Sequence, residues 1–210
     1  MKQKKASVIR SLFYFYDMKQ NIIIILLIIL TLSQCKKDKE ELTSTNEAQT
    51  LKLQESKKIL LDRSSSNLLL NGFASLDEAV KKFLIEVRNT NQIETIELKT
   101  LVDQKEKDFI LYPNIFGHGT SLDVTPLEDY NKMIRSFEVL ALGKLKEKPY
   151  TVSDLKSTKI RVKSVQDYGK TKFHKIGSVI ISTPKGKIEI SEIRSVIQLG
   201  DRYKVAILAP

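Results

Sequence analysis

The 210-residue chain has one cysteine, two histidines and no tryptophan. A single cysteine cannot form a disulfide within the chain, and these few soft ligands exclude a structural zinc site or a Cys–His nucleophile. Only eight glycines and five prolines are present, which excludes a fibrous or low-complexity protein. With 41% hydrophobic and 29% charged residues, the sequence predicts a globular domain with an aliphatic core, no metal and no other cofactor.

The chain also lacks an apolar run long enough to cross a membrane. The longest run, residues 22–32, would measure about 17 Å as a helix, against roughly 30 Å of hydrocarbon core. Asp17 and Lys19 precede it and Lys36 follows it, so neither end can be extended. A basic segment followed by a short apolar run is typical of a secretory signal peptide.

The apolar run leads into "LSQC", which places Leu32 and Ser33 three and two positions before Cys35. This resembles the lipobox of bacterial lipoproteins, and Gln34 in place of the usual small residue is similar to the looser lipoboxes of spirochaetes such as Leptospira. The resemblance implies that residues 1–34 are removed and that Cys35 becomes an acylated amino terminus. Two or three acyl chains, each stabilised by about 0.8 kcal/mol per buried methylene, would hold the protein on a membrane.

The predicted location is therefore the cell envelope, on the inner or the outer membrane, facing the periplasm or the cell surface. An ordinary signal peptide or an uncleaved anchor is the alternative. The triplet "MKQ" occurs at Met1 and again at Met18, and the sequence from Met18 is already a complete short signal. Met18 is therefore a candidate for the true start.

The formal net charge of +10 does not predict a nucleic-acid partner. Residues 1–35 hold five basic and one acidic residue, which leaves 30 basic and 24 acidic residues and a charge of +6 in the remainder. There the basic residues alternate with acidic ones, as in "KKDKEE" and "DQKEKD". Such alternation is typical of a solvated surface, so we expect no nucleic-acid binding.

Composition divides the exported part into a tether and a domain. Residues 35–56 are polar and charged without a sustained apolar period, and we expect them to form a flexible tether. Residues 57–210 are expected to form a single domain of ordinary size.

The first half of this domain predicts helices. Ser75 and Glu78 form a capping box, and a helical period of apolar residues follows it. A weaker helical period runs over residues 93–102, and a short apolar run after it is stopped by Pro113. Residues 114–123 are expected to be a loop.

A third helix is predicted at "TPLEDYNKMIRSFEVLAL". Thr125 and Glu128 have the spacing of a second capping box, with Pro126 at the first helical position. Beyond Pro149 the apolar period becomes that of strands, separated by the turn sequences "QDYG", "PKG" and "GD". We expect an antiparallel meander from this pattern.

The apolar residues of the third strand change parity, which predicts a bulge near Ser191 or Glu192 and a bent sheet. Helices followed by a curved antiparallel meander make an α+β chain that resembles the NTF2-like (cystatin-like) superfamily over residues 73–208. That resemblance implies a sheet wrapped around a helix, with a conical cavity.

One group of side chains suits chemistry in such a cavity: Tyr112, His118 and Asp123, with Tyr130 nearby. Enzymes of the NTF2-like superfamily use Asp, His and Tyr in proton transfer, so the resemblance implies an isomerase- or dehydratase-like site with His118 or Asp123 as base. The alternative is that the glycines of "GHGTS" form a turn and His118 is exposed.

The sequence favours a non-catalytic, lipid-anchored envelope protein that binds a small apolar ligand or a protein partner. The membrane itself is a partner, through acyl chains on Cys35. An NTF2-like enzyme and a surface-exposed host-interaction lipoprotein are the two alternatives.

Overall fold

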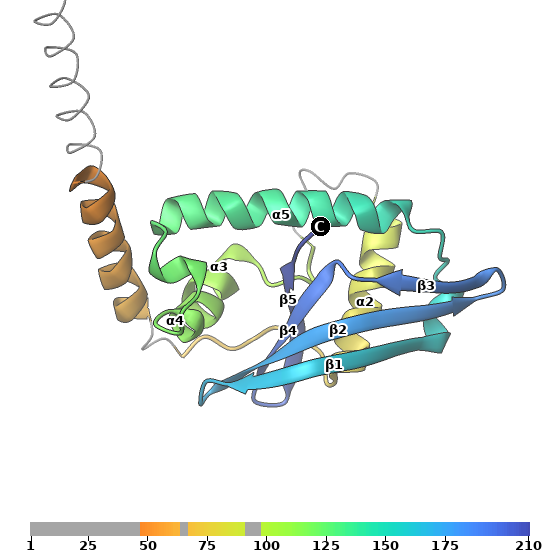
Figure 1. Cartoon of the computed structure of the whole chain (residues 1–210). Helices are drawn as coiled ribbons and strands as arrows, with labels where there is room; N and C mark the ends of the chain where they lie inside the picture. Colours follow the sequence, from red (N-terminus) through yellow and green to blue (C-terminus); the bar gives the residue numbers. More distant parts are fainter. Residues whose placement is uncertain (1–46, 64–66, 91–97) are drawn as a thin grey trace, which may run out of the picture. The chain divides into compact units, whose positions relative to one another are not determined.

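The computed structural model describes residues 47–63, 67–90 and 98–210 (Figure 1). The predicted signal peptide, Cys35 and the first part of the predicted tether lie outside the described residues. The chain divides into two units between residues 51 and 52, and the fold described below is that of residues 52–210.

Residues 47–63 are helical, so a helix crosses the predicted boundary between tether and domain. Leu60 is buried, and the buried Ser56 hydroxyl contacts the start of another helix. Residues 47–56 were predicted as part of the tether, whereas residues 57–63 were predicted as the start of the domain. Besides Ser56 and Leu60, Arg63 also contacts the domain, with its Nη1 3.1 Å from Asp108 Oδ1.

Helix α2 (Leu76–Asn89) confirms the first predicted helix. The Ser75 hydroxyl accepts a hydrogen bond of 3.1 Å from the Glu78 N–H, as the capping box requires. The Glu78 carboxylate, however, accepts the Ala74 N–H at 3.3 Å instead of the Ser75 N–H. The buried face of the helix consists of Ala79, Val80, Phe83, Leu84 and Val87.

A continuous helical run replaces the predicted apolar run and the start of the predicted loop. It comprises α3 (Gln104–Glu106), the π-helix η1 (Lys107–Leu111) and α4 (Tyr112–Ile115). The expectation that Pro113 stops this segment was wrong, because the helical run continues through Pro113, next to the junction of η1 and α4, as far as Ile115.

The weaker helix predicted over residues 93–102 is not found in its described part. Residues 98–100 form a turn, and Leu101 makes a parallel bridge with Val205 of the sheet. Residues 91–97 lie outside the described residues. The apolar spacing of Leu101 and Val102 therefore reflects burial beside a strand and not a helical face.

The predicted capping box at the start of the third helix is also wrong. A short 3-10 helix, η2 (Ser121–Asp123), precedes α5 (Leu127–Glu147), whose N-cap is Pro126 and has no side-chain cap. The Leu127 N–H instead donates to the Ser56 hydroxyl at 2.9 Å. A residue 71 positions earlier thus supplies the cap, which local spacing could not predict.

After the 3-10 helix η3 (Ser153–Ser157), five antiparallel strands complete the α+β fold. They are β1 (Thr158–Asp167), β2 (Thr171–Thr183), β3 (Gly186–Ile190), β4 (Ile193–Leu199) and β5 (Arg202–Leu208). The order is β1-β2-β4-β5, and β3 pairs with β2 alone.

Strands β3 and β4 lie one after the other along the same side of β2. Val179 of β2 pairs with Ile190 of β3, and Lys175 pairs with Ser195 of β4, so one extra residue lies on the β3–β4 side between these pairs. This confirms the predicted bulge, because Ser191 and Glu192 fall within it. The sheet is therefore not a simple meander.

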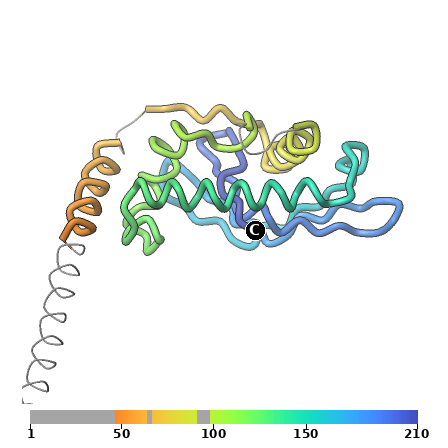
Figure 2. Tube along the Cα trace, turned by 90° about the horizontal axis from the view of Figure 1, so that it is seen from above, coloured from red at the N-terminus to blue at the C-terminus, as the bar shows by residue number. Residues whose placement is uncertain are grey.

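Two apolar clusters cover the sheet on its two faces. Paired residues on neighbouring strands share a face: Val196 and Val205 belong to one cluster, and Phe173 and Ile197 to the other. The first cluster includes residues of α2 and of the second half of α5, whereas the second includes residues of η1, of α4 and of the start of α5. Figures 1 and 2 show α5 running from α4 towards the end of β3.

Candidate functional site

A cleft of about 830 Å³ lies between α5 and the segment that leads into η1. Its apolar lining is formed by Leu98, Leu101 and Val102. Its polar lining includes Lys107, Arg135 and Glu138. A hollow lined by both apolar and charged side chains is suited to a small molecule that has both kinds of surface.

Two residues of this lining, Lys107 and Glu138, form a buried ion pair. Lys107 Nζ lies 2.5 Å from Glu138 Oε1, with 7% and 1% of the two side chains exposed. Glu138 Oε1 accepts no hydrogen bond from the described residues, so its contact with Lys107 is an ion pair alone. On the other side of the carboxylate, Arg135 Nη1 lies 3.7 Å from Glu138 Oε2, and 44% of the arginine side chain is exposed. Two cations therefore flank one buried carboxylate, and one of them reaches solvent.

The local fold explains why Lys107 points inwards. It is the first residue of the π-helix η1, a form of turn that is rare and often lies at functional sites. A buried ion pair is a poor source of stability, because apolar residues of the same volume usually serve as well. The Lys107–Glu138 pair is therefore a candidate for a functional group.

The neighbouring ion pair, Glu106–Lys204, has a structural role. Lys204 Nζ lies 2.7 Å from Glu106 Oε2. The Glu106 carboxylate also accepts the Asp103 N–H at 3.0 Å and the Asn71 N–H at 3.1 Å. It thus joins α3, strand β5 and the segment before α2, and the cleft is not lined by either member of the pair.

Tyr112 does not line the cleft but is hydrogen-bonded to a residue that does. Its hydroxyl donates to Asn131 Oδ1 at 2.8 Å, and Gln104 Nε2 donates to the same oxygen at 3.2 Å. Burial raises the pKa of Tyr112 well above its ordinary value, so the phenol remains a donor. Asn131 and Gln104 both line the cleft, so this network fixes its rim.

The other predicted site residues do not converge with Tyr112 on one cavity. The Asp123 carboxylate accepts the N–H groups of Gly117 at 2.6 Å, Gly119 at 2.7 Å and Thr120 at 2.9 Å. Both glycines have positive φ, which turns their N–H groups towards the carboxylate. Asp123 therefore closes its own loop.

His118 lies at the tip of that loop and is exposed. Its ring contacts Tyr168 in the β1–β2 turn, with 4.6 Å between ring centroids. Tyr130 packs edge-to-face on Tyr112 at 5.3 Å. The structure therefore brings the two tyrosines together and leaves the histidine against another element.

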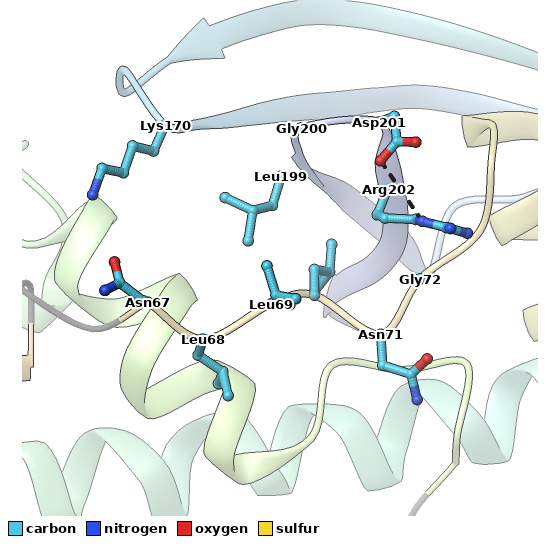
Figure 3. Close-up of a pocket in the computed structure, with 11 residues that line it drawn as sticks. Asn67, Leu68, Leu69, Asn71, Gly72, Lys170, Leu199, Gly200, Asp201 and Arg202 are labelled. Atoms are coloured by element: carbon cyan, nitrogen blue, oxygen red, sulfur yellow. Dashed lines mark ion pairs between the residues drawn. The ribbon is translucent and has the colours of Figure 1, made fainter.

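A second hollow, a groove of about 890 Å³, lies between residues 67–72 and the β4–β5 turn (Figure 3). Leu69, which is 84% exposed, and Leu199 point towards each other across it. Gly72 holds the segment against the sheet, since a Cβ there would lie 2.5 Å from the Tyr203 carbonyl oxygen. This groove has no buried charge, so we regard the cleft as the better candidate.

In the part of the chain that the structure describes, no three acidic, histidine or cysteine side chains gather as a metal site. Within the same ranges, no helix has the length and apolarity to span a bilayer. Comparison with protein-family models, curated proteins and solved structures finds no match to this chain.

Sequence reasoning missed Lys107 and Glu138, although a signal for Glu138 was present. It occupies a buried position in α5 between Tyr130 and Ala141, at the spacing of the helix's apolar face. A charge on such a face needs a buried partner. Lys107 carried no comparable signal, because it belongs to "DQKEKD", which has the composition of a solvated surface.

Proposed function

We propose that this protein is a lipid-anchored, non-catalytic binding module of the cell envelope. Its cleft takes a small molecule with one acidic group and a short apolar part. The observation that supports this most strongly is the buried Lys107–Glu138 pair beside Arg135 in the wall of the cleft.

Arg135 is the cation of the cleft that is best placed to meet an anion. The lining contains three cations, Lys107, Lys132 and Arg135, and two anions, Asp103 and Glu138. Lys107 is paired with Glu138, and Lys132 is paired with Glu128 at 2.7 Å. Asp103 already accepts the Glu106 N–H as a helix cap, at 2.8 Å. A ligand carboxylate near Arg135 would meet a positive environment, and an apolar part would lie against Leu98 and its neighbours.

Several contacts support binding over proton-transfer chemistry. The Tyr112 hydroxyl and the Asp123 carboxylate are engaged by the chain's own groups, and His118 faces solvent. A general base needs access to the proton that it removes. The NTF2-like enzyme that the sequence offered as an alternative would need these three groups in one pocket.

A binding measurement tests the cleft. The probe is octanoate, titrated by calorimetry into residues 36–210, with octanol as the neutral control. We expect saturable binding of octanoate and about tenfold weaker binding by Arg135→Gln, which leaves Lys107 paired with Glu138. Lys144→Gln, an exposed change on the same helix, should bind like the unchanged protein. Equal binding of octanoate by all three chains would refute the assignment.

The anchor is supported by the short apolar run of residues 22–32 and by "LSQC". Metabolic labelling with an alkynyl palmitate analogue should mark the expressed protein and leave Cys35→Ala unmarked. Labelling of both would show attachment elsewhere. Protease treatment of intact cells would then separate a periplasmic domain from a host-facing one, since only the latter is cleaved.

We further propose that the domain is NTF2-like. Helices that precede a bulged antiparallel sheet, and the burial of α2 against that sheet, support this assignment. An experimental structure that superimposes on that superfamily with the same strand order would support it, and a different connection of β3 and β4 would exclude it.

A further inference from the structure

The hairpin β1–β2 carries nearly all of the net charge of the chain beyond residue 35. Residues 158–183 contain six basic residues and one acidic residue, a net charge of +5 out of +6. All six are exposed. They are Lys159, Arg161, Lys163, Lys170, Lys172 and Lys175.

These charges have few partners of their own. Among the residues that the structure describes, the six have one ion pair, between Lys172 and Asp167 at 3.8 Å. The alternation of basic and acidic residues that the sequence shows elsewhere therefore does not extend to the hairpin. Strand pairing brings Lys172 beside Asp167 and Lys175 beside Ser164, so the cations that line the outer strand of the hairpin are Lys159, Arg161 and Lys163.

The same hairpin provides an open sheet edge. At the other edge of the sheet, β5 makes bridges to Phe73 and Leu101. Strand β1 pairs on one side with β2, and no other described segment forms a ladder with it. Val162 and Val165, which are 38% and 51% exposed, lie between the charges. Alternate residues of this ten-residue strand thus direct their N–H and C=O groups away from β2, beside cations and exposed valines.

A second copy of this chain would bring its own row of cations to that edge. Antiparallel pairing about Arg161 would place Lys159 opposite Lys163 and the two arginines opposite each other, and like charges in such positions repel. Register shifts between Arg161 and Ser164 also interrupt the edge. They leave short regular stretches on either side, which suit a short segment better than a long strand.

We propose that the outer edge of β1 is a docking site for a short, extended, acidic segment of a partner protein. The segment adds to the sheet as a strand, its backbone pairs with β1, and its carboxylates lie near Lys159, Arg161 and Lys163. Strand addition supplies affinity through backbone hydrogen bonds, and the side chains select the partner. This site is separate from the cleft and does not depend on the ligand proposed for it.

The test uses the full chain in neutral detergent and a fluorescent ten-residue peptide of alternating glutamate and valine. We expect saturable binding at about 0.15 M salt that weakens markedly at about 1 M salt. Amide hydrogen exchange should slow in β1 when the peptide is added. A peptide of alternating lysine and valine, and the acidic peptide N-methylated at every residue, should not bind.

Charge reversal of the edge provides the matched comparison. The triple variant Lys159→Glu, Arg161→Glu, Lys163→Glu should bind the acidic peptide at least about tenfold more weakly. The double variant Lys185→Glu, Lys187→Glu changes exposed lysines of the β2–β3 hairpin and should bind nearly as well as the unchanged chain.

Three results would overturn the proposal. Equal binding of the N-methylated peptide would mean charge attraction without strand pairing. A dimer in sedimentation experiments that the triple variant abolishes would make a second copy the occupant. Slowed exchange of β1 in anionic nanodiscs, with no effect of the peptide, would assign the surface to the membrane.

Discussion

Charged side chains are buried and paired beside the cleft of the helical region, whereas on the first hairpin they are exposed. Beside the cleft, Lys107 and Glu138 are buried and neutralise each other. On β1, Lys159, Arg161 and Lys163 are exposed and face solvent. The same residue types therefore differ in how much their substitution changes the free energy of unfolding. Buried charges constrain the fold because each needs its partner, whereas exposed charges leave stability almost unchanged and are available to another molecule.

The largest expected effect comes from breaking the Lys107–Glu138 pair. Lys107→Met leaves an almost fully buried carboxylate with only the partly exposed Arg135 beside it, at 3.7 Å, and the free energy of unfolding should fall by about 3–5 kcal/mol. Urea denaturation measures this. The double variant Lys107→Met, Glu138→Leu should regain most of the loss. A double variant as unstable as the single one would show that packing, and not charge, determines the cost.

A smaller loss is expected at the second buried pair. Lys204→Met leaves Glu106 with the N–H groups of Asp103 and Asn71, so the unfolding free energy should fall by about 2 kcal/mol. The same denaturation experiment ranks the two lysines. If Lys204→Met costs more than Lys107→Met, then backbone donors do not compensate the carboxylate, and our distinction between the two pairs is wrong.

Three buried tyrosine side chains predict that the free energy of unfolding declines at high pH. Burial raises the pKa of Tyr112, Tyr130 and Tyr150. The unfolded chain releases these protons from about pH 10, whereas the folded chain keeps them, so the unfolding free energy falls as pH rises past about 10.

Tyr112→Phe tests that cause. It should cost about 1 kcal/mol near neutral pH, through the lost hydrogen bond to Asn131, and should make the decline above pH 10 shallower. Chemical denaturation over a series of pH values measures both effects. An unchanged slope would mean that Tyr112 ionises in the folded protein as easily as in the unfolded one.

The smallest effect is expected on the hairpin. Lys163→Gln removes an exposed charge, and the unfolding free energy should change by no more than about 0.5 kcal/mol. Thermal denaturation in low salt provides the measurement. A loss as large as that of Lys204→Met would show that the hairpin charges stabilise the fold, which would remove the contrast between the two regions.

The fold was predictable where local pattern determines structure. Helix α2 and the β3–β4 bulge follow from spacings of a few residues, Ser75 with Glu78 in one case and a parity change in the other. The start of α5 was not predictable, because its cap is a hydroxyl from Ser56. The run through Pro113 was also missed, because a π-helix has no clear sequence period.

The candidate site was less accessible to sequence reasoning than the fold. Of the residues singled out, Tyr112 supports the rim of the cleft, whereas Asp123 closes a loop and His118 is exposed. Their closeness in sequence suggested a group that tertiary structure does not assemble. Lys107 and Glu138 lie far apart in the chain, and only packing of η1 on α5 brings them together.

Carbon-detected NMR of residues 36–210 during a titration with octanoate tests the central claim most directly. The account predicts saturable shifts of the Glu138 carboxyl and the Arg135 guanidinium carbon signals, with those of Lys159 and Lys163 unchanged. Shifts confined to the hairpin lysines, or no saturable shift at Glu138 and Arg135, would contradict it.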